Sequence, residues 1–204
     1  MKVLFSVACL LVLSLSAFAQ DTPRIEVFGG YSYLRTDGEN TDLTQFGGTG
    51  TATQKGANLN GFNAAFAFNP TSRIGIVADA GGAYGTIKYA FTSGGTTVTI
   101  PASTSFYTFL FGPQANFRGD RNTFFVRPLA GFIHGRQRVP GQVGTATDTA
   151  FAAAFGGGFD RKVSDSISIR IFQADYLLTT FDEGARGNGV QSNLRFSTGF
   201  VFGK

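Results

Sequence analysis

Apolar and polar side chains alternate along several stretches of the chain, and a period of two is typical of β-strands. In residues 73–89, Ile74, Ile76 and Ala78 fall on one face, while Asp79 and Gly81 fall on the other. The same alternation recurs in residues 57–69, 104–117 and 192–203. One face is aromatic or aliphatic and the other is small or polar. This arrangement favours strands that stand between lipid and a narrow lumen.

Eight segments are predicted to be strands, and their connections alternate between short and long. The predicted strands lie near 24–35, 57–69, 73–89, 104–117, 123–136, 148–161, 166–179 and 192–203. Tight polar turns are expected at 69–72, 118–122 and 162–165, and longer loops rich in Gly, Thr, Asn and Asp at 36–56, 90–103, 137–147 and 180–191. Short turns on one side and long loops on the other are typical of outer-membrane barrels. The pattern predicts an all-β fold, an eight-stranded antiparallel up-and-down transmembrane β-barrel.

The predicted strand 166–179 does not alternate cleanly. Arg170 and Phe172 share one parity, and Gln173 and Asp175 share the other. Both polar sets cannot face the lumen of a regular strand. Either a β-bulge separates Arg170 from Gln173, or Arg170 lies at the periplasmic rim with its charged end in water. We favour the rim, because Arg170 follows closely on the predicted turn.

The first nineteen residues have the features of a secretory signal peptide. Lys2 is followed by an apolar run from Val3 to Leu15, and Ala17-Phe18-Ala19 has the small-x-small pattern of a cleavage site. The single cysteine, Cys9, belongs to this segment. We therefore predict a signal peptide at 1–19, a β-barrel domain at 20–204, and localisation in a bacterial outer membrane.

Several charged side chains are predicted to face the lumen. They are Glu26, Asp79, Arg127, Asp175 and Arg195. Buried charges are costly unless they are paired, so we expect a salt-bridge network across the barrel. Such a network would act either as a structural plug that fixes the packing or as a gate on a narrow water path. The plug is favoured, because eight strands leave little open bore.

Enzymatic, metal and cofactor chemistry have little support in the sequence. His134 is the only histidine, and no neighbouring serine or acid accompanies it in sequence. A site for lipid chemistry would need a Ser-His-acid arrangement to form in space. The glycine runs Gly81-Gly82 and Gly156–Gly158 lie within predicted strands, where close packing in the lumen explains them better than phosphate binding. We predict no catalytic residue, no metal and no cofactor.

Three stretches of sequence have a recognisable pattern: 109–118 (FLFGPQANFR), 156–176 with its GGGFD, ISIR and QADY segments, and 193–202 (NLRFSTGFVF). With these stretches the chain resembles the small OmpA-like outer-membrane β-barrels of the porin family. The resemblance extends over essentially all of the predicted mature chain. It implies a barrel fold in the outer membrane, and it implies little about activity.

The expected function is that of a structural envelope barrel, with or without weak, non-selective, porin-like permeability. The expected partners are outer-membrane lipid and lipopolysaccharide, and the barrel-assembly machinery during insertion. No basic cluster suggests nucleic acid. Two alternatives stay open: a recognition protein that binds an extracellular ligand through loops 36–56 and 90–103, and a lipid-modifying enzyme that uses His134.

Overall fold

The computed structural model describes residues 23–42, 51–141, 144–182 and 188–204, so the predicted signal peptide lies outside the described residues. In the described part, no helix is long and apolar enough to cross a membrane. Ten strands are present in these ranges. They are β1 (Ile25–Thr36), β2 (Glu39–Asp42), β3 (Thr51–Lys55), β4 (Asn58–Phe68), β5 (Ile74–Ser93), β6 (Thr96–Arg118), β7 (Asn122–Arg138), β8 (Ala146–Lys162), β9 (Ile167–Asp182) and β10 (Asn188–Gly203).

Eight of these strands close into an antiparallel ring, as predicted. Following the pairings around the ring gives the order β1, β4, β5, β6, β7, β8, β9 and β10, and β10 pairs again with β1. The first and last strands therefore meet in register, with Glu26 opposite Gly203 and Thr36 opposite Asn193. Closure leaves no unpaired edge within the ring, which satisfies the backbone polar groups of the wall.

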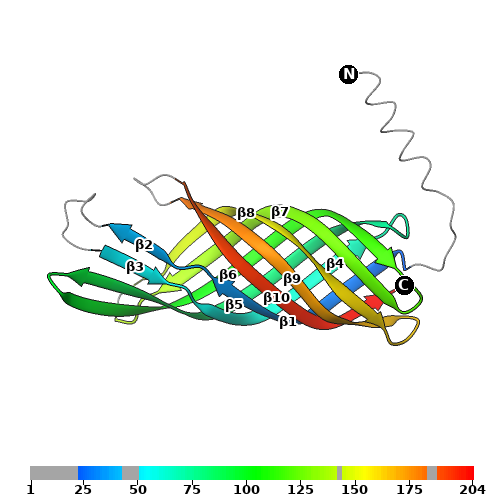
Figure 1. Cartoon of the computed structure of the whole chain (residues 1–204), viewed down its shortest axis with the longest axis horizontal. Coiled ribbons are helices and arrows are strands. Elements are labelled where there is room, and N and C mark those ends of the chain that lie inside the picture. Colours follow the sequence, from blue (N-terminus) through cyan, green and yellow to red (C-terminus); the bar gives the residue numbers. More distant parts are fainter. Residues whose placement is uncertain (1–22, 43–50, 142–143, 183–187) are drawn as a thin grey trace, which may run out of the picture.

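The three short turns and the start of β1 lie at one end of the barrel, together with the C-terminus (Figure 1). We call this the inner end and the opposite end the outer end. The short turns match the predicted ones, at 69–73, 119–121 and 163–166. The asymmetry predicted from the connections is therefore present in the structure.

The predicted long loops are to a large extent strand. Residues 90–103, expected as a loop, belong to a continuous hairpin of β5 and β6 whose turn is Gly94-Gly95. Both glycines have positive φ, 55° and 81°, as the tight turn of a hairpin requires. Residues 36–56, also expected as a loop, contain β2 and β3, and β3 pairs with β5 beyond the barrel wall. Loop predictions at these positions were wrong because Gly- and Thr-rich sequence was taken as a sign of irregular structure.

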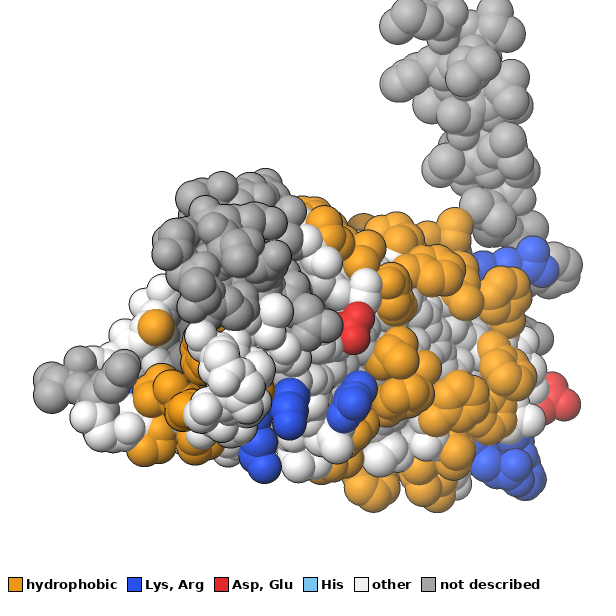
Figure 2. Space-filling view, turned by 60° about the vertical axis from the view of Figure 1, so that its left-hand side comes forward, with side chains coloured by type: hydrophobic (Ala, Val, Ile, Leu, Met, Phe, Trp, Pro, Cys, Tyr) orange, Lys and Arg blue, Asp and Glu red, His pale blue; other side chains and the backbone are white. Residues whose placement is uncertain are grey.

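The alternating faces lie as the sequence predicts. Phe62, Phe66 and Phe68 of β4 point outward and are about half exposed, while Asn63 and Ala65 between them are buried. Phe109 and Phe111 of β6 and Phe196, Phe200 and Phe202 of β10 point outward in the same way. On the face that Figure 2 shows, hydrophobic side chains form a broad band, with Lys and Arg at both edges of the band.

Strand β9 contains a β-bulge, so our preference for the periplasmic rim at Arg170 was wrong. Asp160 pairs with Arg170 while Phe159 pairs with Phe172, which leaves Ile171 as the extra residue. Ile171 and Phe172 both point outward. The bulge restores the inward direction for the polar residues on both sides of it, and Arg170 is buried in the lumen.

Candidate functional site

Four of the five charged residues predicted for the lumen meet near the middle of the barrel. Arg127 Nη2 lies 2.9 Å from Asp79 Oδ2 and 3.4 Å from Asp175 Oδ2. Arg195 Nη1 lies 2.9 Å from Asp79 Oδ1, and Arg195 Nη2 lies 2.8 Å from Asp175 Oδ2. The two acids and two bases thus form a closed ring of ion pairs, which we call the lumen quartet. Each member is at most 3% exposed.

Glu26, the fifth residue predicted for this network, does not join the quartet. It lies at the inner end of β1, where Arg118 binds it through two hydrogen bonds of 3.0 and 3.1 Å. Asn69 Nδ2 also donates to Glu26 Oε2 at 2.8 Å. The parity of Glu26 is inward, but its position at the inner end of the strand places it beside the turns rather than at mid-height.

A second ion pair, which the sequence reasoning missed, lies between the quartet and the inner end. Arg170 Nε and Nη2 donate to the two carboxylate oxygens of Asp160 at 2.8 and 2.9 Å. The guanidinium of Arg170 also stacks against the rings of Phe28 and Phe125, with its central carbon 4.3 Å from each ring centre. The inward parity of Asp160 in β8 could have revealed the pair, since an inward acid requires a cation nearby.

Two amide side chains connect the ion pairs into one network. Gln173 accepts a hydrogen bond from Arg170 Nη1 at 2.7 Å and donates to Asp175 Oδ2 at 2.6 Å. Asn63 Nδ2 donates to Asp79 Oδ1 at 3.0 Å. Each group of charges is internally neutral, with two acids against two bases in the quartet and one against one in the second pair. Such an arrangement keeps the cost of burying charge low.

The lumen above the quartet, toward the outer end, is filled, and it contains a layer of apolar side chains beside the buried polar residues Thr104, Thr108, Thr179 and Asn193. Leu34, Leu59, Ile87, Ile133 and Leu177 point inward there, and each is at most 3% exposed. The cavity beside Arg195 in this region has a volume of only about 10 Å³. This is at or below the space that one buried water occupies. The apolar layer and the quartet together act as a two-layer plug.

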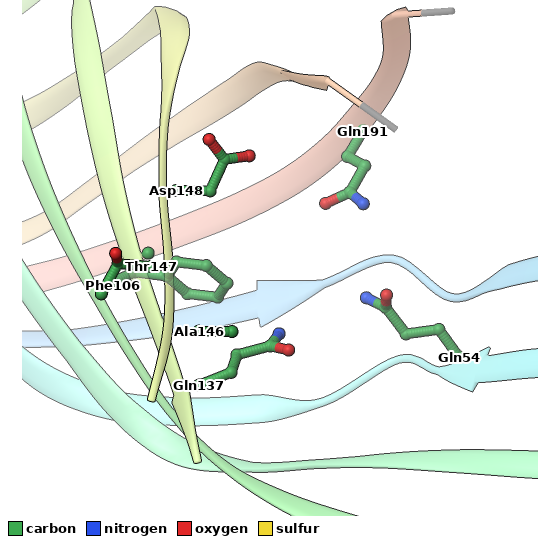
Figure 3. A pocket seen from close by; sticks show the side chains of 8 residues that line it. Gln54, Phe106, Gln137, Ala146, Thr147, Asp148 and Gln191 are labelled. Carbon is green, nitrogen blue, oxygen red and sulfur yellow. The ribbon is translucent and has the colours of Figure 1, made fainter. Parts of the chain in front are cut away.

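A hollow of about 210 Å³ opens at the outer mouth, above the apolar layer. Polar side chains from four strands point toward it: Gln54 of β3, Gln137 of β7, Asp148 of β8 and Gln191 of β10 (Figure 3). Gln137 also donates a hydrogen bond to Tyr89 Oη at 2.8 Å, which ties the extended part of β5 to β7. Phe106, 9% exposed, lies at the bottom of the hollow.

His134, considered for lipid chemistry, points outward near the outer end of β7. Its Nδ1 lies 2.8 Å from Thr149 Oγ1 on the neighbouring strand. Asp148 is adjacent to Thr149 in sequence but points to the opposite, inward face. Among the described residues, no Ser-His-acid arrangement forms around His134, and no cluster of three or more metal-ligating side chains is found.

Comparison with known proteins gives structural likeness only. No family model matches the chain, and no curated protein matches it by sequence. Ail, the attachment invasion locus protein of Yersinia pestis, in complex with the heparin analogue sucrose octasulfate, has a TM-score of 0.55 at 17% identity, covering 89% of this chain and 99% of that one. OprG of Pseudomonas aeruginosa has 0.53 at 10% identity, covering 89% and 95%. Neisserial surface protein A has 0.53 at 9% identity, covering 91% and 100%.

At these levels of identity the likeness concerns the fold alone. The ring of eight antiparallel strands, the outward band of phenylalanines and the paired charges inside agree with that likeness. The chain therefore has the fold of the small outer-membrane β-barrel proteins.

Proposed function

We propose that the protein is a structural barrel of the bacterial outer membrane whose lumen does not conduct. The single observation that carries the proposal is the two-layer plug, in which the fully buried Leu59 and Leu177 lie above the lumen quartet. An ion that crossed would have to pass an apolar layer and then displace buried charges that already have partners. Of the two roles considered for the charge network, the plug is favoured over the gate.

The outward band supports membrane residence. On β5 it extends from Ile74 to Tyr84, eleven positions along the strand. At about 3.3 Å per residue and a tilt of about 40°, this spans about 25 Å along the barrel axis, which matches the apolar band of outer-membrane barrels. Tyr31 and Tyr84 lie at the outer edge of the band, where aromatic side chains are typical of a membrane–water interface.

Conductance measurements test the proposal directly. The purified protein, shown to be folded by faster gel migration without heating, is inserted in planar bilayers, with a known open porin as the positive control. We expect no conductance steps, and no swelling of liposomes in sugar solutions. Regular steps from the folded protein would overturn the closed-barrel proposal.

Recognition of an extracellular ligand is a second candidate function, and the hollow at the mouth favours it. The hollow presents three amides and one carboxylate, from Gln54, Gln137, Gln191 and Asp148. Such groups both donate and accept hydrogen bonds, so they suit a ligand rich in hydroxyl groups, such as a glycan. The bound sucrose octasulfate in the Ail structure is a sulfated sugar, whereas this hollow contains a carboxylate, so a neutral sugar suits it better.

Glycan-array binding with the detergent-folded protein tests the second candidate. We expect selective retention of neutral glycans, reduced about tenfold or more in Asp148→Ala, since losing a charged hydrogen-bond partner costs about 1.5–3 kcal/mol. Thr180→Ala, on the outward face of β9, is the matched control. Equal signals from both variants and the parent would exclude the hollow as the binding site.

A further inference from the structure

A groove runs along the outward face of the barrel over β5. Its floor is made of small side chains, Ala64, Ala78, Ala80 and Ala130, and its walls include Phe66, Phe109, Phe111 and Phe132. Its volume is about 560 Å³. The register explains its shape, because Ala80 lies between Ala64 and Phe109, and Ala78 lies between Phe66 and Phe111. The groove lies at mid-height in the apolar band.

The outward positions of β5 lead from this groove to a cluster of cations. Beyond Tyr84 the next outward residues of the strand are Thr86 and Lys88, and Lys88 lies directly opposite Lys55 of β3. Like charges placed opposite each other on one sheet face repel, so this pair calls for an anion. Both lysines are exposed.

Two arginines extend the cluster from β7. Cross-strand rows connect Tyr84 through Ser105 to Arg136, and Thr86 through Ser103 to Arg138. Neighbouring strands are about 4.8 Å apart, so each arginine backbone lies about 10 Å from β5 with only a serine between them. Both arginines are exposed, and among the described residues none of the four cations has an ion-pair partner. We call Lys55, Lys88, Arg136 and Arg138 the cationic cluster.

The opposite side of the barrel lacks this feature. The outward side chains Thr147 and Thr149 of β8, Leu178 and Thr180 of β9, and Val190 and Ser192 of β10 are neutral. The charge is therefore concentrated on the side of the barrel that also carries the groove. Two independent features, one apolar and one cationic, coincide on β5 and its neighbours.

We infer that this face binds one phosphorylated, acylated lipid of the outer leaflet, the lipid A part of a lipopolysaccharide, with an acyl chain in the groove and its phosphates at the cationic cluster. Ala80 and Lys88 are eight residues apart, which is about 26 Å along the strand and about 20 Å along the barrel axis at a tilt of about 40°. Half of the hydrocarbon core is about 15 Å thick. A chain that reaches Ala80 therefore has its head group at the height of the cluster.

The inference rests on the proposed membrane location, and it goes beyond it by naming a site and a ligand. Native mass spectrometry of the folded protein in detergent measures the binding. Phosphorylated lipid A, dephosphorylated lipid A, phosphatidylglycerol or inorganic phosphate is added in separate experiments. We expect one phosphorylated lipid A per barrel, bound at least tenfold tighter than the other three. The double variant Lys55→Gln/Lys88→Gln should weaken this binding about tenfold. The variant Ala80→Phe fills the groove and should also weaken the binding when the lysines are unchanged.

Two control variants make the same kinds of change away from the proposed lipid site. Arg161→Gln removes an exposed cation at the inner end, and Ala174→Phe adds a ring to the outward face of β9, so both should bind as the parent does. Equal binding by the double lysine variant and the parent would overturn the inference, as would equal binding of phosphatidylglycerol or of dephosphorylated lipid A. A barrel that folds but shows no lipid preference refutes this inference alone, whereas a chain that does not fold in detergent refutes the proposed membrane location.

Discussion

Arg170 binds both carboxylate oxygens of Asp160 inside the barrel, with its guanidinium between the rings of Phe28 and Phe125. Removing one member of a buried ion pair leaves the other charge without a partner, which costs about 3–5 kcal/mol. We expect Asp160→Asn and Arg170→Met each to lower the free energy of unfolding by about this amount, measured by urea titration in lipid vesicles.

The double variant Asp160→Asn/Arg170→Met should lose less than the sum of the two single variants, because it leaves no unpaired charge. The exposed pair of Lys162 and Asp165, 2.9 Å apart, provides the control. Lys162→Met should change the free energy of unfolding by less than about 1 kcal/mol. Single-variant losses as small as that of the control would contradict the structural role of the buried pair.

Ile171 is the extra residue of the bulge in β9, so deleting it should leave a regular strand. Without Ile171, the order Arg170, Phe172, Gln173 runs inward, outward, inward, and every other side chain keeps its face. We therefore expect the deletion variant to fold, with unheated gel migration like that of the parent. Deleting Ala174 instead shifts the strand so that either Asp175 faces lipid or Phe172 enters the lumen, and this variant should not fold. Equal folding of the two variants would show that β9 does not depend on the bulge.

Gly156 packs directly against the lumen quartet, which explains part of the Gly156–Gly158 run. A Cβ at Gly156 would lie 2.2 Å from Asp175 Oδ1 and 2.4 Å from the Ala174 carbonyl oxygen. We expect Gly156→Ala to lower the free energy of unfolding by about 1–3 kcal/mol, as overpacking does. Gly29→Ala is the matched control, since nothing lies within 4 Å of its added Cβ. Similar unfolding curves for the two variants would contradict the tight contact.

Tyr89, in the part of β5 beyond the apolar band, has a pKa raised above its ordinary value, mainly because burial disfavours the phenolate. A folded pKa above the unfolded one contributes stability below about pH 10, and that stability is lost as the pH rises through the raised value. The difference in tyrosinate absorbance between the parent and Tyr89→Phe should show a midpoint above pH 10. Gln137→Leu should raise it further, because the amide donates to Tyr89 Oη and lowers the pKa. A midpoint at or below pH 10 would place Tyr89 in water.

The wall of the barrel could be predicted from the sequence because its chemistry repeats every second residue. Phe62, Phe66 and Phe68 gave the outward face of β4 without any knowledge of the partner strands. Pairing across the lumen was harder, since it depends on the height of each residue as well as its face. Glu26 and Asp79 both point inward, yet one lies beside the turns and the other at mid-height.

The sequence pattern also could not place a local irregularity such as the β-bulge in β9. The pattern around Arg170 allowed a bulge or a position at the rim, and the register with the neighbouring strand, where Asp160 pairs with Arg170, decides between them. The groove and the cationic cluster could not be predicted either, because they depend on which side chains lie next to each other across strands. The cross-strand register, such as Lys55 opposite Lys88, follows from strand pairing and not from the order of residues along one strand.

The long hairpin of β5 and β6 has a further consequence for how the exposed part of this molecule can change. Beyond Ser103, β6 pairs with β5 alone, and residue faces residue up to Ser93 and Thr96 at the tip. Removing two residues from each strand near Gly94-Gly95 would shorten the projection by two rungs, keep the kind of pair that closes the turn, and leave every pairing below it intact. The height of this projection can therefore drift between lineages while the barrel beneath it is inherited unchanged.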